Sequence, residues 1–410
     1  MAAPLIPAGF DFTDPDLLAE RLPVAEFAEL RRTAPVWWNP QKHNTAGYRD
    51  DGYWVVSRHA DVKEVSRDST LYSSREKTAI IRFDENMTED NLEANRLVLL
   101  NQDAPQHTKL RRIVSKGFTP RSISKLEDTL RDRADRIVHE ARKKGSGDFV
   151  TDVACELPLQ AIAELIGIPQ EDRLKIFDWS NQMVAYDDPE YEVAPLEASA
   201  QLVGYAWNMA EDRRKCPMDD IATKLIQADV DGESLGSDEF GFFVILLAVA
   251  GNETTRNSIS HGIRAFCDYP EQYQLLANDP SLASQATEEI VRWATPIVAF
   301  QRTATRDTEL GGAQIRKGDR VGMFYSSANF DHEVFEDPEK FDILREDNPH
   351  VGFGGTGSHY CIGANLARLE IDLIFNAIAD VMPGITEAAP PMRLRSSWIN
   401  GIKHYPVNYA

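Results

Sequence analysis

Residues 352–363 read Gly-Phe-Gly-Gly-Thr-Gly-Ser-His-Tyr-Cys-Ile-Gly, a glycine-dense loop that delivers Cys361 to the start of a helix. Glycines permit the unusual dihedrals of a tight turn and allow close approach of other groups to the backbone. A helix N-terminus and a metal ion both favour deprotonated sulfur. The loop therefore fits a buried thiolate ligand, but alone it fits a glycine-rich anion loop with an incidental buried cysteine about as well.

The composition limits the classes of protein to which this chain can belong. It has 410 residues, 42% of them hydrophobic, and a formal net charge of −21. This apolar content can fill one large core, and no repeat, low-complexity tract or linker interrupts the sequence, so we expect residues 1–410 to form one domain. The acidic balance opposes binding to nucleic acid and to an anionic membrane surface. The expected ligands are neutral molecules or proteins.

Cysteine usage and the N-terminal segment bear on location. The four cysteines form no disulfide framework and lack the paired spacing of zinc sites, which indicates a reducing compartment. The first residues contain no basic cluster followed by an apolar run, and the longest apolar run, 241–251, is too short to cross a bilayer. We therefore expect a cytoplasmic protein without a membrane span.

Apolar residues three and four apart indicate helices along most of the chain. The predicted helices span residues 24–32, 105–117, 122–144, 152–166, 196–214, 218–227, 238–268, 284–293 and 362–381. Strands are expected at 36–38 and 53–57, with a β-rich stretch at 299–329 and acidic surface loops at 187–192 and 229–233. The predicted fold class is mainly α with a minor β region, and the helix at 238–268 is apolar enough to cross the core.

The long predicted helix carries Ala-Gly-Asn-Glu-Thr-Thr at residues 250–255. Ala250 and Gly251 lie four and three positions before Thr254, so all three share one face and form a notch beside an alcohol. Glu253 would gate protons there while Thr254 hydrogen-bonds to oxygen held at a metal. The alternative is a glycine kink with a capped threonine, which explains one residue better than the whole run.

Glu289 and Arg292 are spaced i to i+3 on one face of the predicted helix 284–293. Most such pairs are solvated surface bridges of little energetic weight. Between the long helix and the cysteine loop, however, the pair would form a buried clamp at the base of the loop. Arg345 is the predicted third member of this clamp, and Lys340 is the alternative.

A haem iron explains these features together, because a thiolate opposite dioxygen promotes cleavage of the O–O bond. The two propionates of a haem need arginine or histidine donors. His107 and Arg111 lie four apart on one predicted helix, Arg302 begins the β-rich stretch, and His359 comes two residues before the cysteine. For each of these four residues taken singly, a surface or capping role is the commoner one.

The order of the alcohol motif, the Glu289/Arg292 pair and the cysteine loop resembles soluble bacterial cytochromes P-450 over essentially the whole chain. This resemblance implies a prism-shaped fold with haem b between the long distal helix and the cysteine-side helix, and Cys361 as the axial iron ligand. It also implies dioxygen as co-substrate and electrons from NAD(P)H through a ferredoxin reductase and a ferredoxin. Ala250, Phe353 and Gly363 are further expected haem contacts.

One position departs from the general family pattern. The aromatic residue usually found seven before the cysteine is Gly354 here, and Phe353 stands one step earlier. Phe353 is expected to shield the sulfur from a slightly different angle.

Longer stretches resemble the actinobacterial steroid branch of the family, which oxidises the terminal side-chain methyl, carbon 26 or 27, of cholesterol and cholest-4-en-3-one. These stretches are residues 14–23, 35–39, 250–257, 289–296, 300–304, 348–357 and 398–404. The resemblance implies hydroxylation of that methyl, with further oxidation to aldehyde and acid. The alternatives are the same chemistry on a branched fatty acid, terpenoid or xenobiotic, and, more remotely, a non-catalytic haem-binding sensor.

The same resemblance suggests residues that contact the substrate, all of them apolar and carried on loops or on the long helix. They are Ile81, Phe83, Val98, Val249, Val298, Ala299 and Trp398. Apolar walls of this kind suit a long apolar ligand in a channel above a haem.

Overall fold

The computed structural model describes residues 6–83, 87–191, 195–218, 220–227 and 235–410. Its α-helices are α1 (Pro15–Glu20), α2 (Val24–Thr33), α3 (His59–Arg67), α4 (Glu89–Asn95), α5 (Gln106–Val114), α6 (Pro120–Ser124), α7 (Glu127–Lys144), α8 (Glu156–Ile166), α9 (Arg173–Val184), α10 (Pro195–Lys215), α11 (Ile221–Ile226), α12 (Ser237–Asp268), α13 (Pro270–Asn278), α14 (Ala283–Ala294), α15 (Tyr325–Ala328) and α16 (Ala364–Val381). The predicted mainly helical fold class is confirmed.

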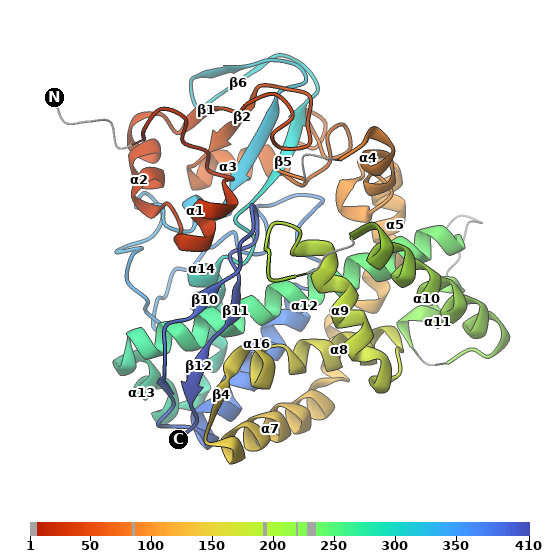
Figure 1. Ribbon diagram of the computed structural model, residues 1–410, viewed down its shortest axis with the longest axis vertical. Coiled ribbons are helices and arrows are strands. Elements are labelled where there is room, and N and C mark those ends of the chain that lie inside the picture. Colours follow the sequence, from red (N-terminus) through yellow and green to blue (C-terminus); the bar gives the residue numbers. More distant parts are fainter. Residues whose placement is uncertain (1–5, 84–86, 192–194, 219, 228–234) are drawn as a thin grey trace.

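Helix α12 crosses the middle of the molecule (Figure 1) and packs against α8, α9, α10, α14 and α16. It begins after Gly236, whose N–H donates to the Glu239 carboxylate at 2.9 Å, so an acidic first turn caps the helix N-terminus. Most of its side chains are buried. This all-round burial is what the continuous apolar stretch of the sequence predicted.

The strands form small sheets; the sheets with β1, β2, β5 and β6 lie at one end of the molecule, while β10 and β11 lie near its middle and β4 and β12 near the C-terminus (Figure 1). The strands are β1 (Val36–Pro40), β2 (Gly52–Val56), β3 (Tyr72–Ser73), β4 (Ser146–Asp148), β5 (Ala299–Ala304), β6 (Thr308–Leu310), β7 (Ala313–Ile315), β8 (Arg320–Phe324), β9 (Thr386–Glu387), β10 (Met392–Arg393), β11 (Ile402–His404) and β12 (Pro406–Asn408). The largest sheet has the order β1-β2-β8-β5-β3, in which only the β2–β8 pair is parallel. Strand β5 brings residues 299–304 beside the cysteine loop's cavity.

Several predicted boundaries were wrong. The helix expected at 122–144 is interrupted after α6, and the one expected at 152–166 starts as a π-helical turn at Val150–Ala154. Helices α1, α3, α4, α9 and α13 were not predicted, and neither was α15, which lies within the stretch expected to be β-rich. Helix α9 packs against both α10 and α12 and also reaches the cavity, so its apolar residues are not confined to one face.

The acidic stretch expected to be a surface loop at 187–192 is partly buried. Asp188 is 2% exposed because its carboxylate accepts hydrogen bonds from Lys403 Nζ and from the backbone N–H of Arg395. Glu192 and the other predicted acidic loop, 229–233, lie outside the described residues.

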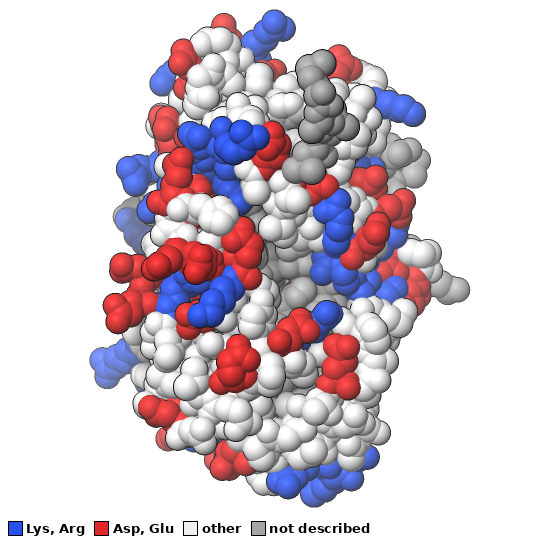
Figure 2. Space-filling model, turned by 90° about the vertical axis from the view of Figure 1, so that its left-hand side faces the viewer, with Lys and Arg blue, Asp and Glu red and all other residues white. Residues whose placement is uncertain are grey.

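Positive and negative side chains are interspersed over the face shown in Figure 2, which carries no broad all-basic area. Within the described residues, no helix combines the length and apolar character needed to span a bilayer.

Candidate active site

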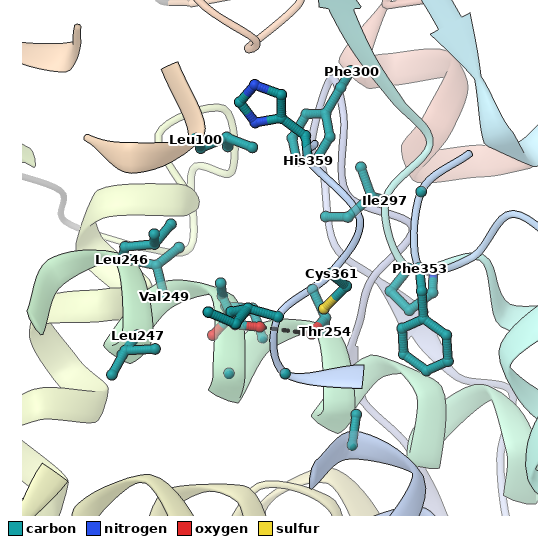
Figure 3. A pocket seen from close by; sticks show the side chains of 18 of the residues that line it. Leu100, Leu246, Leu247, Val249, Thr254, Ile297, Phe300, Phe353, His359 and Cys361 are labelled. Carbon is teal, nitrogen blue, oxygen red and sulfur yellow. Dashed lines mark hydrogen bonds between the residues drawn. The ribbon is translucent and has the colours of Figure 1, made fainter. Parts of the chain in front are cut away.

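A cavity of about 320 Å³ lies between α12 and the loop that carries Cys361. Cys361 points into it from the start of α16, and Thr254 lies across from it on α12 (Figure 3). Leu246, Val249, Ile297 and Phe300 form apolar walls beside this pair. The cavity thus joins one sulfur to one hydroxyl in largely apolar surroundings, which suits an apolar ligand.

The turn around Cys361 depends on its glycines. Gly357 has a φ of +101°, and a Cβ there would lie 2.7 Å from the Ser66 carbonyl oxygen. Only a glycine fits such a position without strain. The turn is closed by the Cys361 N–H, which donates to the Phe353 carbonyl at 3.0 Å.

The surroundings of the Cys361 sulfur suit a thiolate only when a metal is bound to it. Burial raises the pKa of the Cys361 thiol, although the Gly363 N–H and the nearby guanidinium groups of Arg111 and Arg368 act in the opposite direction. Without a metal the sulfur would therefore remain a neutral thiol, whereas coordination to iron deprotonates such a thiol outright. The N–H groups at the helix start and the two cations would then stabilise the thiolate.

Four basic side chains gather at one rim of the cavity. His107 and Arg302 are 2% and 3% exposed, Arg111 and His359 join them in the cavity wall, and the two imidazole rings lie 4.0 Å apart. In the described part of the chain none of these four residues forms an ion pair with a carboxylate, and His107 Nε2 has no hydrogen-bond partner. Among the residues that the structure describes, Arg302 donates only to the neighbouring Gln301 carbonyl, at 2.7 Å.

This basic cluster is electrostatically incomplete. Burial, together with the neighbouring Arg111 and Arg302, lowers the pKa of His107 to about 4 and that of His359 to about 2. A dianion would reverse these shifts and satisfy the free donors. The two propionates of a haem whose iron is bound to Cys361 fit this requirement, so the residues present fit the cofactor.

Glu253 and Thr254 both line the cavity but have different surroundings. Glu253 is 1% exposed and forms an ion pair with Arg256, and burial raises the pKa of its carboxyl although Arg256 opposes this. Thr254 Oγ1 donates to the Ala250 carbonyl at 2.6 Å, so the hydroxyl oxygen remains free to accept a hydrogen bond from the cavity. The cavity wall thus contains both a buried acid and a hydroxyl acceptor, the two kinds of group that proton transfer requires.

The Glu289/Arg292 pair is fully buried beneath the cysteine loop. Arg292 donates from Nη2 and Nε to the two carboxylate oxygens of Glu289 at 2.7 and 2.8 Å, and from Nη1 to the carbonyls of Asn329 and Pro338, both at 2.9 Å. Arg345 Nε donates to Glu289 at 3.2 Å. Lys340 contributes its backbone carbonyl, while its ammonium pairs with Asp342. Arg345, and not Lys340, therefore supplies the third charge.

Most residues singled out from the sequence line this one cavity. They are Phe83, Val98, His107, Arg111, Val249, Ala250, Glu253, Thr254, Arg302, Phe353, His359, Cys361, Gly363 and Trp398. Ile81, Val298 and Ala299 are buried in the core, and their neighbours Ile80, Ile297 and Phe300 line the cavity instead. For these three residues the structure does not support the predicted substrate contact.

The position of Ala299, the one of these three residues on β5, follows from strand alternation. Side chains two apart share a face of a strand, so Phe300 must lie on the face that Arg302 presents to the cavity, and Ala299 on the other. This signal was available in the sequence. Tyr325, the first residue of α15, also lines the cavity near Arg302, and it was missed because only the folded chain brings the end of β8 next to β5.

Comparisons with known proteins give the same result as the geometry. The family model described as cytochrome P-450 matches residues 159–379. A steroid C26-monooxygenase of Rhodococcus jostii is 63% identical over 409 residues, covering 100% of this chain and 86% of the relative. A methyl-branched lipid omega-hydroxylase of Mycobacterium tuberculosis is 42% identical over 94% of this chain and 90% of the relative. A Mycobacterium marinum cytochrome P-450, solved in complex with pseudoionone, superposes with a TM-score of 0.91 at 37% identity, covering 100% of both chains.

The chain therefore belongs to the cytochrome P-450 family. This family uses haem and dioxygen for monooxygenation. The position of Cys361 opposite Thr254, with the basic cluster at one rim, agrees with that cofactor.

Proposed function

We propose that this chain is a haem-thiolate monooxygenase that hydroxylates the terminal side-chain methyl, carbon 26 or 27, of a sterol such as cholest-4-en-3-one or cholesterol. Further oxidation of the alcohol to aldehyde and acid would follow at the same site. The observation that carries the proposal is the apolar cavity between Cys361 and Thr254. The 63% identity to a steroid C26-monooxygenase supports the choice of substrate.

Each side chain of the site has a defined task in this proposal. Cys361 would hold the iron, and the haem would supply the activation of dioxygen. His107, Arg111, Arg302 and His359 would bind the propionates, and Tyr325 lies close enough to Arg302 to assist. Glu253 would hold a proton near Thr254 Oγ1, whose oxygen accepts from the cavity side. The apolar walls would exclude bulk water from the reacting carbon.

The sterol would enter with its flexible tail toward Thr254. A terminal methyl offers no hydrogen-bonding group, so only the shape of the apolar walls can position it. Val249, Leu246 and Ile297 surround that end of the cavity (Figure 3). Phe83, Val98 and Trp398 would contact the more distant ring system.

A second candidate substrate is a methyl-branched fatty acid, which presents the same kind of terminal methyl. The relative named methyl-branched lipid omega-hydroxylase, at 42% identity, favours it over a terpenoid or a xenobiotic. Both reactions need the same residues around Thr254. They differ in whether the far end of the cavity accommodates fused rings or a carboxylate.

Titration of the purified haem protein with cholest-4-en-3-one, and in parallel with a methyl-branched fatty acid, separates these candidates. We expect the sterol to shift the haem to high spin and to yield a 26-hydroxylated product, identified by mass spectrometry, with NAD(P)H, a ferredoxin and its reductase. A spectrum that responds only to the branched lipid would overturn the sterol assignment. Substrate binding without any product would favour the haem-binding sensor instead.

The electron partners and the location remain part of the proposal. We expect NAD(P)H-derived electrons to arrive one at a time through a ferredoxin, and the whole chain, residues 1–410, to act as one monooxygenase domain in the cytoplasm. No nucleic-acid partner is expected, given the net charge of −21.

A further inference from the structure

A second charged group lies next to the Glu289 clamp, on the thiolate side of the cavity. Glu288, on α14, accepts hydrogen bonds from Arg368 of α16 at both carboxylate oxygens, with Nε–Oε1 at 2.5 Å and Nη2–Oε2 at 2.9 Å. It also contacts His350 Nε2 at 3.1 Å. This bidentate geometry fixes the plane of the guanidinium, which a single surface contact would not do.

Phe353 is held by this group from two sides. Arg368 Cζ lies 4.4 Å from the centroid of the Phe353 ring, and the ring of His350 lies 5.7 Å from it. A guanidinium at this distance from an aromatic face is attracted by the ring quadrupole. The carbonyl of Phe353 also accepts the N–H of Cys361. The same residue is therefore tied to Arg368 through its ring and to the sulfur-bearing residue through its backbone.

The unusual position of Phe353 in the sequence makes its contact with Arg368 important for the orientation of its ring. The ring stands eight residues before Cys361, with Gly354 at a φ of +91° between the ring and the rest of the loop. A glycine at this conformation leaves the adjoining backbone without a side chain to pack, so the orientation of Phe353 depends on its neighbours in space. Arg368 and His350 are the side chains whose ring or charge contacts supply that support.

Arg368 also acts on the sulfur by charge. Its guanidinium lies over the ring of Phe353, whose carbonyl accepts the Cys361 N–H, so the positive charge is close to the cysteine loop. Arg368 and Glu288 are 33% and 30% exposed, so solvent screens part of this field. A cation beside a thiolate withdraws electron density from it and so favours the reduced, less positive iron.

We propose that Arg368, held by Glu288, is a positioning residue that fixes Phe353 beside the thiolate and raises the reduction potential of the haem iron. The inference rests on the haem-thiolate site of the proposed function. It predicts that Arg368 sets the reduction potential partly through the ring of Phe353, and not through its charge alone.

The test is the reduction potential of substrate-free haem protein, measured by spectroelectrochemistry, in Arg368→Gln, Arg368→Lys and Glu288→Gln. We expect Arg368→Gln to shift the ferric–ferrous equilibrium toward ferric iron about tenfold, a fall of about 59 mV. Arg368→Lys keeps the charge but loses the bidentate contact and should fall by less. Arg131→Gln, which removes an exposed arginine paired with Glu127, is the matched control and should leave the potential unchanged.

A double variant separates positioning from charge. On a Phe353→Leu background, Arg368→Gln should change the potential by less than it does in the wild type, because part of its effect passes through the ring. Full additivity would overturn the positioning role, and a wild-type potential in Arg368→Gln would overturn the whole inference. If Arg368→Gln does not retain haem, Arg368→Lys decides, because it keeps the charge and loses the bidentate contact with Glu288; an unchanged potential there overturns the positioning role.

The reduced, carbon-monoxide-bound spectrum distinguishes failure of this inference from failure of the proposed function. A wild-type Soret band without thiolate character would overturn the haem-thiolate site and this inference with it. A thiolate-type band combined with an unchanged potential in the variants overturns only the role of Arg368.

Discussion

The thiolate side of the cavity and the side formed by residues 186–190 are held by charged networks of opposite character. On the thiolate side, the carboxylate of Glu289 and the guanidinium of Arg292 are sealed from solvent, and Arg292 donates to backbone carbonyls. On the other side, residues 186–190 are tied to the C-terminal residues 395–404, which lie beside them in Figure 1. We call this second network the C-terminal tether.

The C-terminal tether combines one buried carboxylate with partly exposed partners. Lys403 Nζ contacts Asp188 at 3.1 Å and Glu190 at 2.7 Å, and its side chain is 13% exposed. His404 lies 2.7 Å from both Asp148 and Glu190. The same segments supply Tyr186 and Trp398 to the cavity wall, joined by a 3.1 Å hydrogen bond.

The difference indicates which part of the site is held rigidly and which part can open. A sealed ion pair with every donor satisfied responds little to salt or pH, and losing one partner strands the other. A partly exposed network is weaker and can open under ordinary conditions. The loop of Cys361, the proposed iron ligand, is thus held by the first kind of network, and the proposed substrate wall by the second.

The largest expected effect comes from breaking the sealed network. Glu289→Ala leaves Arg292 and Arg345 without their shared carboxylate, and removing one partner of a buried ion pair costs about 3–5 kcal/mol. We expect loss of haem, measured as haem per chain by absorbance, together with a lower unfolding midpoint. Lys340→Ala is the control, since its ammonium makes only an exposed pair with Asp342, and it should keep full haem content. Haem loss in the Lys340 variant would show that the clamp has been assigned to the wrong cation.

The next effect should appear in catalysis and leave both networks intact. Thr254→Ala removes the hydroxyl next to Glu253, and proton transfer by a positioned group contributes roughly 10²–10⁴-fold to a rate. We expect normal haem content and continued NAD(P)H consumption, but a product yield per NAD(P)H lower by about tenfold or more, with peroxide released. Thr33→Ala, which deletes the same kind of i−4 hydroxyl contact on α2, should retain full coupling. Full coupling in Thr254→Ala would refute the assigned role.

A smaller effect should follow from loosening the C-terminal tether. Lys403→Met leaves the buried Asp188 carboxylate without its cation, and an unsatisfied buried group costs about 1–3 kcal/mol or more when charged. We expect the sterol to dissociate roughly tenfold faster in stopped-flow measurements, with haem content unchanged, because 1.4 kcal/mol corresponds to a factor of ten. Lys143→Met, which breaks an exposed pair with Glu140, should leave dissociation unaltered. Equal dissociation rates in the two variants would remove the tether from substrate retention.

The smallest effect should be the response of the tether to pH. Burial disfavours the charged form of His404, but hydrogen bonds to Asp148 and Glu190 outweigh this and raise its pKa. The tether is therefore complete below the ordinary histidine range and weakens as the pH rises through the raised pKa. We expect sterol dissociation to accelerate with rising pH in the wild type and to lose this dependence in His404→Gln. A pH dependence that persists in His404→Gln would assign it to another group.

The sequence predicted the network on the cysteine side of the cavity, but it did not predict the C-terminal tether. The Glu289/Arg292 spacing, the Cys361 loop and the notch at Ala250 are local patterns, and helix geometry places i, i+3 and i+4 residues together without further information. The class of fold followed from the apolar periodicity, which is also local. The finer substrate choice came from resemblance to the steroid branch.

The errors and omissions have one physical origin. Ile81, Val298 and Ala299 were predicted to line the cavity, but the residue next to each of them in the sequence lines it instead. The sequence of a loop or strand does not by itself show which face an apolar residue presents. Asp188 was expected on the surface, because its partner Lys403 is distant in the chain. The choice between Arg345 and Lys340 stayed open for the same reason.

The sequence by itself determined the helical fold class, the cysteine loop and the acid-alcohol pair at Glu253 and Thr254, because each depends on residues within a few positions of one another. Only the tertiary structure decided which apolar side chains reach the cavity, that Arg345 completes the clamp, and that Arg368 and His350 flank Phe353. These contacts join helices and loops far apart in the chain. Their existence depends on how the whole core packs, which no local pattern encodes.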